Sequence, residues 1–159
     1  MKTSRIGIEF IKKFEGCKLK AYKPVPTEKY YSIGYGHYGA DVKKGMEISQ
    51  SQAETYLVKD LAIAENALNI TGVNFTQNQF DSLVSWIYNL GVGNFKSSTM
   101  RKYIIARKES EPITDQMVKW VNSNGKPLLG LKRRRVAEAN MFTGKELYYI
   151  DNSGKIKKH

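Results

Sequence analysis

The chain has 159 residues, enough for one domain or for two small lobes that share a core. A hydrophobic content of 41% excludes an intrinsically disordered protein, and the one cysteine, Cys17, excludes an intrachain disulfide bond and a cysteine metal cluster. We expect Cys17 to be a small packed residue. The formal net charge of +11 favours a polyanionic partner, such as nucleic acid, an anionic membrane surface or a negatively charged cell wall.

The sequence offers little support for two of these partners. No stretch approaches the roughly 20 apolar residues of a membrane span, so we expect no stable membrane insertion. The first 16 residues hold no apolar run long enough for a signal peptide, which predicts synthesis in the cytoplasm. Zinc-finger spacing, an aromatic RNA-binding signature and a basic region joined to heptads are all missing, so no nucleic-acid partner is expected.

The first predicted element is a helix over residues 4–15. Its apolar residues recur at helical spacing, and Thr3 or Ser4 can cap its start: the stripe is Ile6, Phe10, Ile11 and Phe14. Gly16 suits the left-handed position that follows a helix. Glu15 therefore stands in the last turn, where the negative end of the helix dipole and partial burial both disfavour its charged form. A general acid that works near neutral pH needs such a carboxyl group.

Residues 16–48 change period and predict a small sheet lobe. Apolar and aromatic residues alternate with lysines, serine and glycines over 19–21 and 31–36, which is typical of short antiparallel strands. Pro24 and Pro26 mark the turn between them, because proline cannot donate to a strand ladder.

The rest of the chain predicts helices. Ser49 with Gln52, and Thr76 with Gln79, form two capping boxes. The expected elements are a connecting helix over 49–69, a buried helix over 80–90 ended by Gly91, shorter helices opened by Ser97 or Ser98 and by Thr114, a loop over 122–127 and a last helix over 128–142. Residues 1–15 and 70–144 would form a helical lobe of the same single domain. The basic tail over 145–159 could be a hairpin or a frayed end.

Four segments, in this order along the chain, resemble phage-type lysozymes, which are endolysins of the muramidase class (glycoside hydrolase family 24). They are FEG with LKAY and YYSIGYGH over 14–37, Ser-x-x-Gln-Ala-Glu over 49–54, FDSLVSWIYNLGVGNF over 80–95 and GLKRRRVAEANMF over 130–142. The resemblance covers roughly residues 5 to 144. It implies an α+β, lysozyme-like fold: a small antiparallel sheet lobe and a larger helical lobe, with the glycan held in the cleft between them. It also implies hydrolysis of the β-1,4 bond between N-acetylmuramic acid and N-acetylglucosamine in peptidoglycan.

The catalytic residues follow from the family pattern of a glutamate, an aspartate nine residues on and a threonine before Ile-Gly-x-Gly-His. Glu15 matches the glutamate, and Ser32 replaces the threonine and keeps a hydroxyl group. Pro24 stands where the aspartate belongs, and the segment from Glu15 to Ser32 is two residues longer than the usual spacing. Glycoside hydrolysis ordinarily needs two carboxyl groups. The nearest substitute is Glu28, which either faces the cleft or is an exposed turn glutamate beside Lys29.

The resemblance also suggests supporting residues. Arg134 or Arg135 would pair with Glu15, and His37 would pair with Asp60 in a structural role. The residues expected to bind sugar are Tyr35, Ser85, Asn89 and Trp120, although Trp120 could instead be buried. With His159 as the only other histidine, neither a metal site nor a cofactor is expected.

The leading hypothesis is thus a monomeric endolysin, made in the host cytoplasm and acting on peptidoglycan glycan strands after release. One alternative keeps the fold but has lost the aspartate's function, leaving a catalytically weakened peptidoglycan-binding module. A basic nucleic-acid-binding protein is the weakest alternative, and it would show salt-sensitive retention on DNA.

Overall fold

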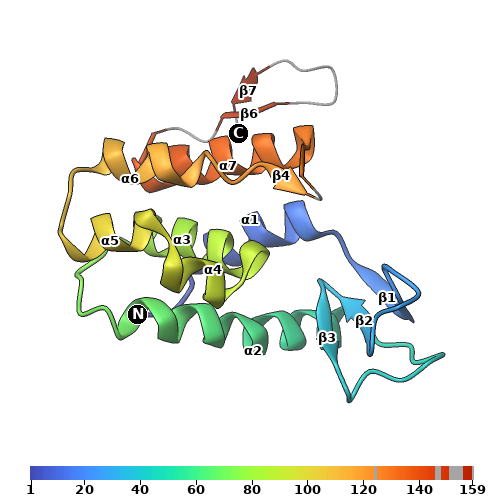
Figure 1. Cartoon of the computed structure of the whole chain (residues 1–159). Helices are drawn as coiled ribbons and strands as arrows, with labels where there is room; N and C mark the ends of the chain where they lie inside the picture. Colours follow the sequence, from blue (N-terminus) through green and yellow to red (C-terminus); the bar gives the residue numbers. More distant parts are fainter. Residues whose placement is uncertain (124, 146–147, 151–155, 159) are drawn as a thin grey trace. The chain divides into compact units, whose positions relative to one another are not determined.

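The computed structural model describes residues 1–123, 125–145, 148–150 and 156–158 (Figure 1). It divides into two compact units, which we call the sheet unit (Ile8–Ala62) and the helical unit (Met1–Gly7 with Ile63–His159). The boundaries fall within helices α1 (Arg5–Glu15) and α2 (Gln50–Asn69), so each of these helices contributes residues to both units.

Helix α1 begins and ends where the sequence predicts. The Ser4 hydroxyl accepts a hydrogen bond from the Gly7 N–H (3.2 Å), and Gly16 follows the helix with φ of 66°. The predicted apolar stripe is wrong at Ile6, because this side chain is 65% exposed. Gly7 is buried instead: a Cβ atom there would lie 2.6 Å from Cγ of Asp81, so the helix turns its smallest residue toward that carboxylate.

The sheet unit holds an antiparallel sheet of three strands in the order β1 (Lys18–Tyr22), β2 (Tyr31–Gly34) and β3 (His37–Gly39). Between β1 and β2 the pairing shifts: Lys18 lies opposite Gly34 and Tyr22 opposite Ser32, so β1 carries extra residues. Gly34, with φ of 64°, lies against α2, since a Cβ atom there would be 3.3 Å from that of Ala53.

The outer edge of β1 is covered by the segment that precedes α2. The Ala21 N–H donates to the Met46 carbonyl (2.8 Å), and the Ile48 N–H donates to the Leu19 carbonyl (3.0 Å). Cys17, in the link from α1 to β1, is exposed, so the expectation of a packed thiol is wrong. The thiol lies on a short surface connection and donates a hydrogen bond to Oε1 of Gln50 (3.7 Å).

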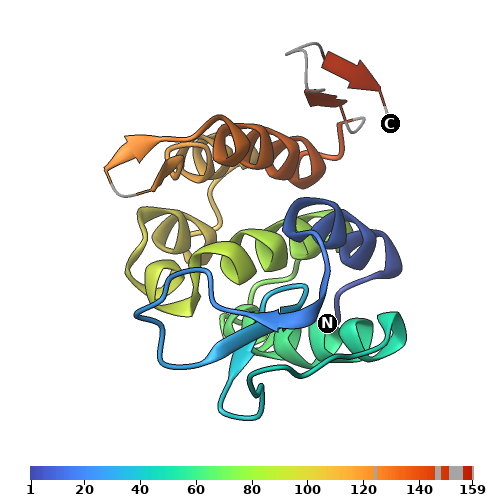
Figure 2. The same ribbon diagram turned by 90° about the vertical axis from the view of Figure 1, so that its right-hand side faces the viewer.

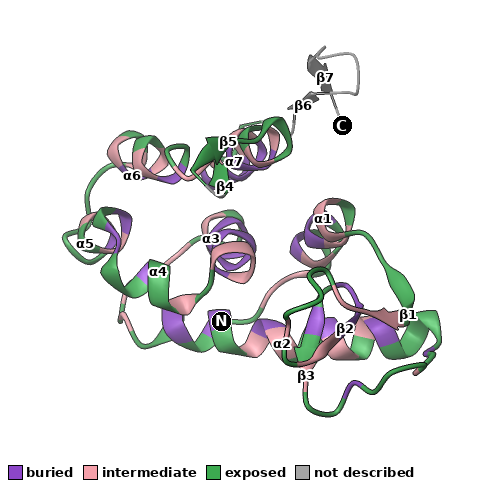
Figure 3. Ribbon diagram, turned by 45° about the vertical axis from the view of Figure 1, so that its right-hand side comes forward, coloured by how far each residue is buried: buried purple, intermediate pink, exposed green. Residues whose placement is uncertain are grey.

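Helix α2 begins with the predicted capping box: the Ser49 hydroxyl accepts from the Gln52 N–H (3.1 Å) and the Gln52 side chain accepts from the Ser49 N–H (3.2 Å). Buried and exposed residues alternate along α2, so that one face of the helix packs inward, as Figure 3 shows. The buried apolar residues of the sheet unit are Phe10, Ile11, Ile33, Tyr35, Val42, Ile48, Ala53, Leu57 and Leu61. These residues join α1, the sheet and α2 into one core.

The helical unit is built around two helices that lie side by side, α3 (Gln77–Leu90) and α7 (Leu129–Phe142) (Figure 1 and Figure 2). The predicted capping box of Thr76 and Gln79 opens α3, and Gly91, with φ of 89°, follows it. Every residue from Phe80 to Ile87 is buried, as the apolar run predicted.

The remaining elements are α4 (Val92–Ser97), α5 (Thr99–Ile105), α6 (Ser110–Met117), β4 (Asn122–Ser123), β5 (Lys126–Pro127), β6 (Tyr148–Ile150) and β7 (Ile156–Lys158). Ser98 caps α5, as predicted, by accepting from the Arg101 N–H. The sequence missed α4, and α6 begins four residues before Thr114. Pro112 lies in the first turn of α6, where its missing N–H costs no helical hydrogen bond.

Two segments without a predicted helix form antiparallel strand pairs. β4 pairs with β5 in what was expected to be a loop, and β6 pairs with β7 in the tail, which favours the hairpin over the frayed end. Residues 151–155, between β6 and β7, lie outside the described residues. Helices with small antiparallel sheets confirm the predicted α+β class.

Candidate active site

The three predicted catalytic residues all belong to the sheet unit. Glu15 is the last residue of α1, and its side chain is half-buried. Ser32 lies in the middle strand, with only 6% of its surface exposed. Within the described part of the chain, the Ser32 hydroxyl has no hydrogen-bond partner, so it remains available to hold a water molecule or a sugar hydroxyl.

Tyr22 lies beside the predicted catalytic residues, although the sequence did not single it out. It ends β1 directly opposite Ser32. Burial raises the pKa of Tyr22, and the negative charges of Glu15 and Glu28 raise it further. Both carboxylates therefore lie close enough to act on one phenol group, which stays protonated and can donate a hydrogen bond. Its position in the LKAY motif was the signal, because β1 follows the glutamate that is predicted to be catalytic.

Glu28 lies in the turn between β1 and β2 and is half-buried. Its N–H donates to the Val25 carbonyl (3.1 Å), and its own carbonyl accepts from the Lys23 ammonium (2.6 Å). These two contacts hold the backbone of the turn and do not involve the Glu28 carboxylate, whose charge raises the pKa of Tyr22. Glu28 thus lies in the turn, half-buried rather than exposed, and its charge reaches the same phenol as that of Glu15.

The predicted pair of His37 and Asp60 is present, with 2.8 Å between Nδ1 and Oδ2. The other ring nitrogen, Nε2, lies 3.0 Å from Oδ2 of Asp41, which the sequence did not single out, and the ring stacks on Tyr56 at 4.3 Å. Burial lowers the pKa of His37, but the hydrogen bonds to Asp41 and Asp60 outweigh it, and the pKa is raised. The hydrogen bond to His37 lowers the pKa of Asp41. We call this group the histidine clamp (His37, Asp41 and Asp60).

Tyr35 was expected to bind sugar, but only 5% of its surface is exposed. Its hydroxyl accepts a hydrogen bond from Nε2 of Gln50 (2.5 Å), and the Lys12 ammonium lies 5.7 Å from its ring centre. The tyrosine therefore packs the sheet against α1 and α2. This placement corrects the predicted sugar contact, because a buried ring leaves almost no surface for a ligand.

A buried ionic cluster links α3 with α7 in the helical unit. Glu138 is fully buried and accepts from Nε of Arg134 (3.0 Å), and its other carboxylate oxygen lies 3.1 Å from Nε of Arg135. The Ser85 hydroxyl donates to the same carboxylate (2.7 Å), and the Ser82 hydroxyl donates to the Glu138 carbonyl (2.7 Å). Burial raises the pKa of Glu138, and the charges of Arg135 and Arg134 oppose that effect. We call these residues the arginine cluster.

The arginine cluster corrects one predicted sugar-binding residue. Ser85 is fully buried, and its hydroxyl is used by Glu138, so it cannot contact a glycan directly. Asn89 is half-buried and accepts a hydrogen bond from Arg135 (2.8 Å). Trp120 is also half-buried, with its ring edge-on to Trp86 at 5.2 Å. Asn89 and Trp120 keep exposed surface, so their predicted role stands as a proposal. So does the pairing of an arginine with Glu15.

Metal ligands were not expected, and among the described residues no group of three or more histidine, cysteine, aspartate or glutamate side chains could hold a metal ion. No helix within the described ranges is long and apolar enough to cross a membrane.

The chain is similar to known proteins over most of its length. The family model described as Phage lysozyme matches residues 12–138. An endolysin of Bacillus phage B103 is 46% identical over 143 residues, which cover 89% of this chain and 54% of that protein, so the chain spans about half the length of this relative.

Two solved structures are similar in sequence and in fold. The endolysin from Escherichia coli O157:H7 phage FAHEc1 has a TM-score of 0.77 and 38% identity, over 89% of this chain and 93% of that one. The muramidase domain of SpmX from Asticaccaulis excentricus has a TM-score of 0.80 and 33% identity, over 89% and 97% of the two chains. These likenesses confirm the lysozyme-like fold, and the chain belongs to the phage lysozyme family.

Proposed function

We propose that the chain is an endolysin that hydrolyses the β-1,4 bond between N-acetylmuramic acid and N-acetylglucosamine in bacterial peptidoglycan. The observation that carries the proposal is the match of the Phage lysozyme family model to residues 12–138, which include Glu15 at the end of α1 and Ser32 on β2. Cleavage of a glycosidic bond ordinarily needs two carboxyl groups. Glu28 is the candidate for the second one, because its charge, like that of Glu15, raises the pKa of Tyr22. Similar proteins named as endolysins and as a muramidase domain support the same activity.

In the proposed mechanism, Glu15 is the general acid. It donates a proton to the glycosidic oxygen as the bond to the anomeric carbon breaks. Ser32 holds a water molecule on the opposite face of the sugar, because its hydroxyl is available among the described residues. Glu28 takes the proton of this water and supports the positive charge of the transition state. The configuration at the anomeric carbon is then inverted, which calls for two carboxylates roughly 6.5–9.5 Å apart.

The partner and the place of action follow from the activity. The substrate is the glycan strand of the cell wall, and the net charge of +11 attracts the chain to an anionic wall. We propose that the chain works as a monomer on the wall after release from the host cytoplasm. No nucleic acid takes part.

The test is Glu15→Gln, which keeps the shape of the side chain and removes the acid. We expect a loss of at least about 100-fold in the rate at which purified peptidoglycan releases reducing ends, since general acid catalysis contributes 100- to 10,000-fold. Glu9→Gln is the matched control, because Glu9 is an exposed glutamate on the same helix. Normal lysis by the Glu15→Gln variant would show that the acid has been misassigned.

Glu28→Gln separates an enzyme with a substitute carboxylate from a weakened binding module. We expect a similar loss of turnover, with sedimentation of the protein on peptidoglycan unchanged. Full activity of Glu28→Gln would remove Glu28 from the mechanism. A wild-type protein that binds the wall and releases no reducing ends would support the binding module instead.

A further inference from the structure

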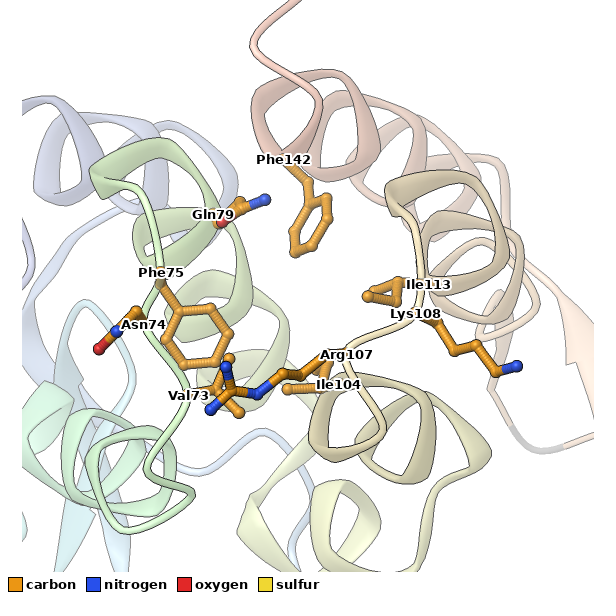
Figure 4. Close-up of a pocket in the computed structure, with 9 residues that line it drawn as sticks. All are labelled: Val73, Asn74, Phe75, Gln79, Ile104, Arg107, Lys108, Ile113 and Phe142. Carbon is orange, nitrogen blue, oxygen red and sulfur yellow. The ribbon is translucent and has the colours of Figure 1, made fainter.

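A hollow on the helical unit is used neither by the proposed catalysis nor by the two ionic groups. Its volume is about 200 Å³, and it lies between the segment before α3 and the ends of α5, α6 and α7 (Figure 4). Its apolar lining residues are Val73, Phe75, Ile104, Ile113 and Phe142, of which the last three are buried. Every lining residue belongs to the helical unit.

The size and the lining suit a small apolar group. A dry cavity of about 150 Å³ is enough to hold a benzene ring. Phe75 and Phe142 offer two aromatic rings, and Ile104 and Ile113 offer branched side chains, all directed into the same space (Figure 4). A hollow of this kind binds a ligand by removing its apolar surface from water.

Arg107 gives the hollow a charge and carries backbone strain. Its φ is 52°, and it is the only residue other than glycine with a positive φ in the part of the chain that the structure describes. It follows α5, with its N–H bonded to the Ile104 carbonyl and the Lys108 N–H bonded to the Tyr103 carbonyl (both 3.0 Å). Glycine is the usual residue in this helix-ending position, because a side chain is strained there.

The strained position carries the cation that reaches the hollow. In Figure 4 the Arg107 guanidinium extends toward Phe75 and Val73, whereas the Lys108 ammonium points away. A guanidinium group at the edge of an apolar space matches a carboxylate attached to an apolar body, since it can donate two parallel hydrogen bonds. An arginine at a position where glycine would be less strained points to a role for its side chain.

We propose that this hollow binds a small free carboxylate with an aromatic end, the ring lying among Phe75, Ile113 and Phe142 and the carboxylate on Arg107. The site is separate from the proposed catalytic residues, so the inference does not depend on glycan hydrolysis. Binding would hold the end of α5 against α6 and α7, and would therefore raise the melting temperature of the protein.

The test is a titration of the whole chain with 3-phenylpropionate, followed by methyl NMR. We expect saturable shifts of the Ile104 and Ile113 methyl groups, weaker binding of the uncharged 3-phenylpropan-1-ol, and no shifts from propionate, which lacks the ring. Absence of saturable shifts up to about 20 mM, where even a millimolar site is filled, would overturn the proposal. So would shifts from propionate equal to those from 3-phenylpropionate.

Two neighbouring cations provide the matched variants. Arg107→Gln should weaken binding about fivefold, the value of an exposed ion pair worth about 1 kcal/mol, whereas Lys108→Gln should change it less than twofold. Arg107→Gly should weaken binding as much as Arg107→Gln and yet leave the melting temperature of the free protein equal or higher, because glycine relieves the strain. Equal effects of the Arg107→Gln and Lys108→Gln variants would show that no carboxylate lies on Arg107.

Discussion

Each of the two units contains one polar group that ties its elements together, and the two groups differ in how they hold charge. The arginine cluster joins α3 with α7 through a fully buried Glu138 and guanidinium groups that are always charged. The histidine clamp joins β3 with α2 through a ring that is 8% exposed and lies between Asp60 and an exposed Asp41.

The difference lies in what can titrate. Arginine keeps its charge at any pH at which the protein is folded, so loss of the Glu138 carboxylate leaves uncompensated positive charge in the interior. Histidine changes charge near neutral pH, so the clamp strengthens or weakens with conditions. In the arginine cluster only the anion Glu138 titrates, with a pKa raised by burial, whereas in the histidine clamp the cation titrates as well.

The largest effect is expected from Glu138→Gln. It leaves Arg134 and Arg135 buried without their carboxylate, and breaking a buried pair in this way costs about 3–5 kcal/mol of the free energy of unfolding. Urea denaturation followed by circular dichroism measures the loss. Glu111→Gln, at an exposed glutamate of α6, is the control and should change stability by less than about 0.5 kcal/mol. A loss below about 1 kcal/mol in the Glu138→Gln variant would show that the two guanidinium groups do not depend on the Glu138 carboxylate.

A smaller, pH-dependent effect is expected from His37→Gln. Hydrogen bonds to charged groups make the clamp worth about 2 kcal/mol. Because the pKa of folded His37 is raised, its stabilisation is complete below the unfolded value of 6.5 and is lost as the pH rises through the folded value. The lowered pKa of Asp41 gives the other limit, since its stabilisation is complete above 3.8 and is lost as the pH falls.

The measurement is the difference in unfolding free energy between the wild-type and His37→Gln proteins as a function of pH. It should be greatest between about pH 4 and 6.5 and should shrink on the alkaline side. A pH-independent difference for His37→Gln would remove the contrast between the two units.

The smallest effects should be equal in the two units. Ser49→Ala removes the capping box of α2, and Thr76→Ala removes that of α3. Each loses the acceptor for one N–H group at the helix start, which costs about 1 kcal/mol. Denaturant midpoints of the two variants should therefore shift by similar amounts, and a large inequality would show that neighbours of one cap, rather than the cap itself, determine its contribution.

Local chemistry explains which features could be predicted from the sequence. Ser49, Thr76 and Ser98 were found because a cap is formed by residues two or three positions apart. The start of α6 was missed, since Thr114 looks like a cap and Pro112 looks like a break until the helix is known to begin ahead of both.

Contacts between distant positions were harder to predict. Ser85 and Glu138 are 53 positions apart, so nothing local shows that the serine hydroxyl is used by a carboxylate on another helix. The spacing of Arg134, Arg135 and Glu138 did hold a signal, because residues three and four apart share one face of a helix. Tyr35 was expected to bind sugar from the family resemblance, but the glycines on either side of it, Gly34 and Gly36, have positive φ and form the turn between β2 and β3.

The shifted pairing of β1 with β2 has a consequence for how the family can vary. After the register shift, Tyr22 on β1 pairs with Ser32 on β2. This pairing holds the two ends of the connection over residues 23–30 in place, whatever the length of the connection. Insertions or deletions there would change the surface of the connection without displacing Glu15 at the end of α1 or Ser32 on β2. The sheet unit can therefore accept a connection of another length at little cost to the framework that holds these two residues.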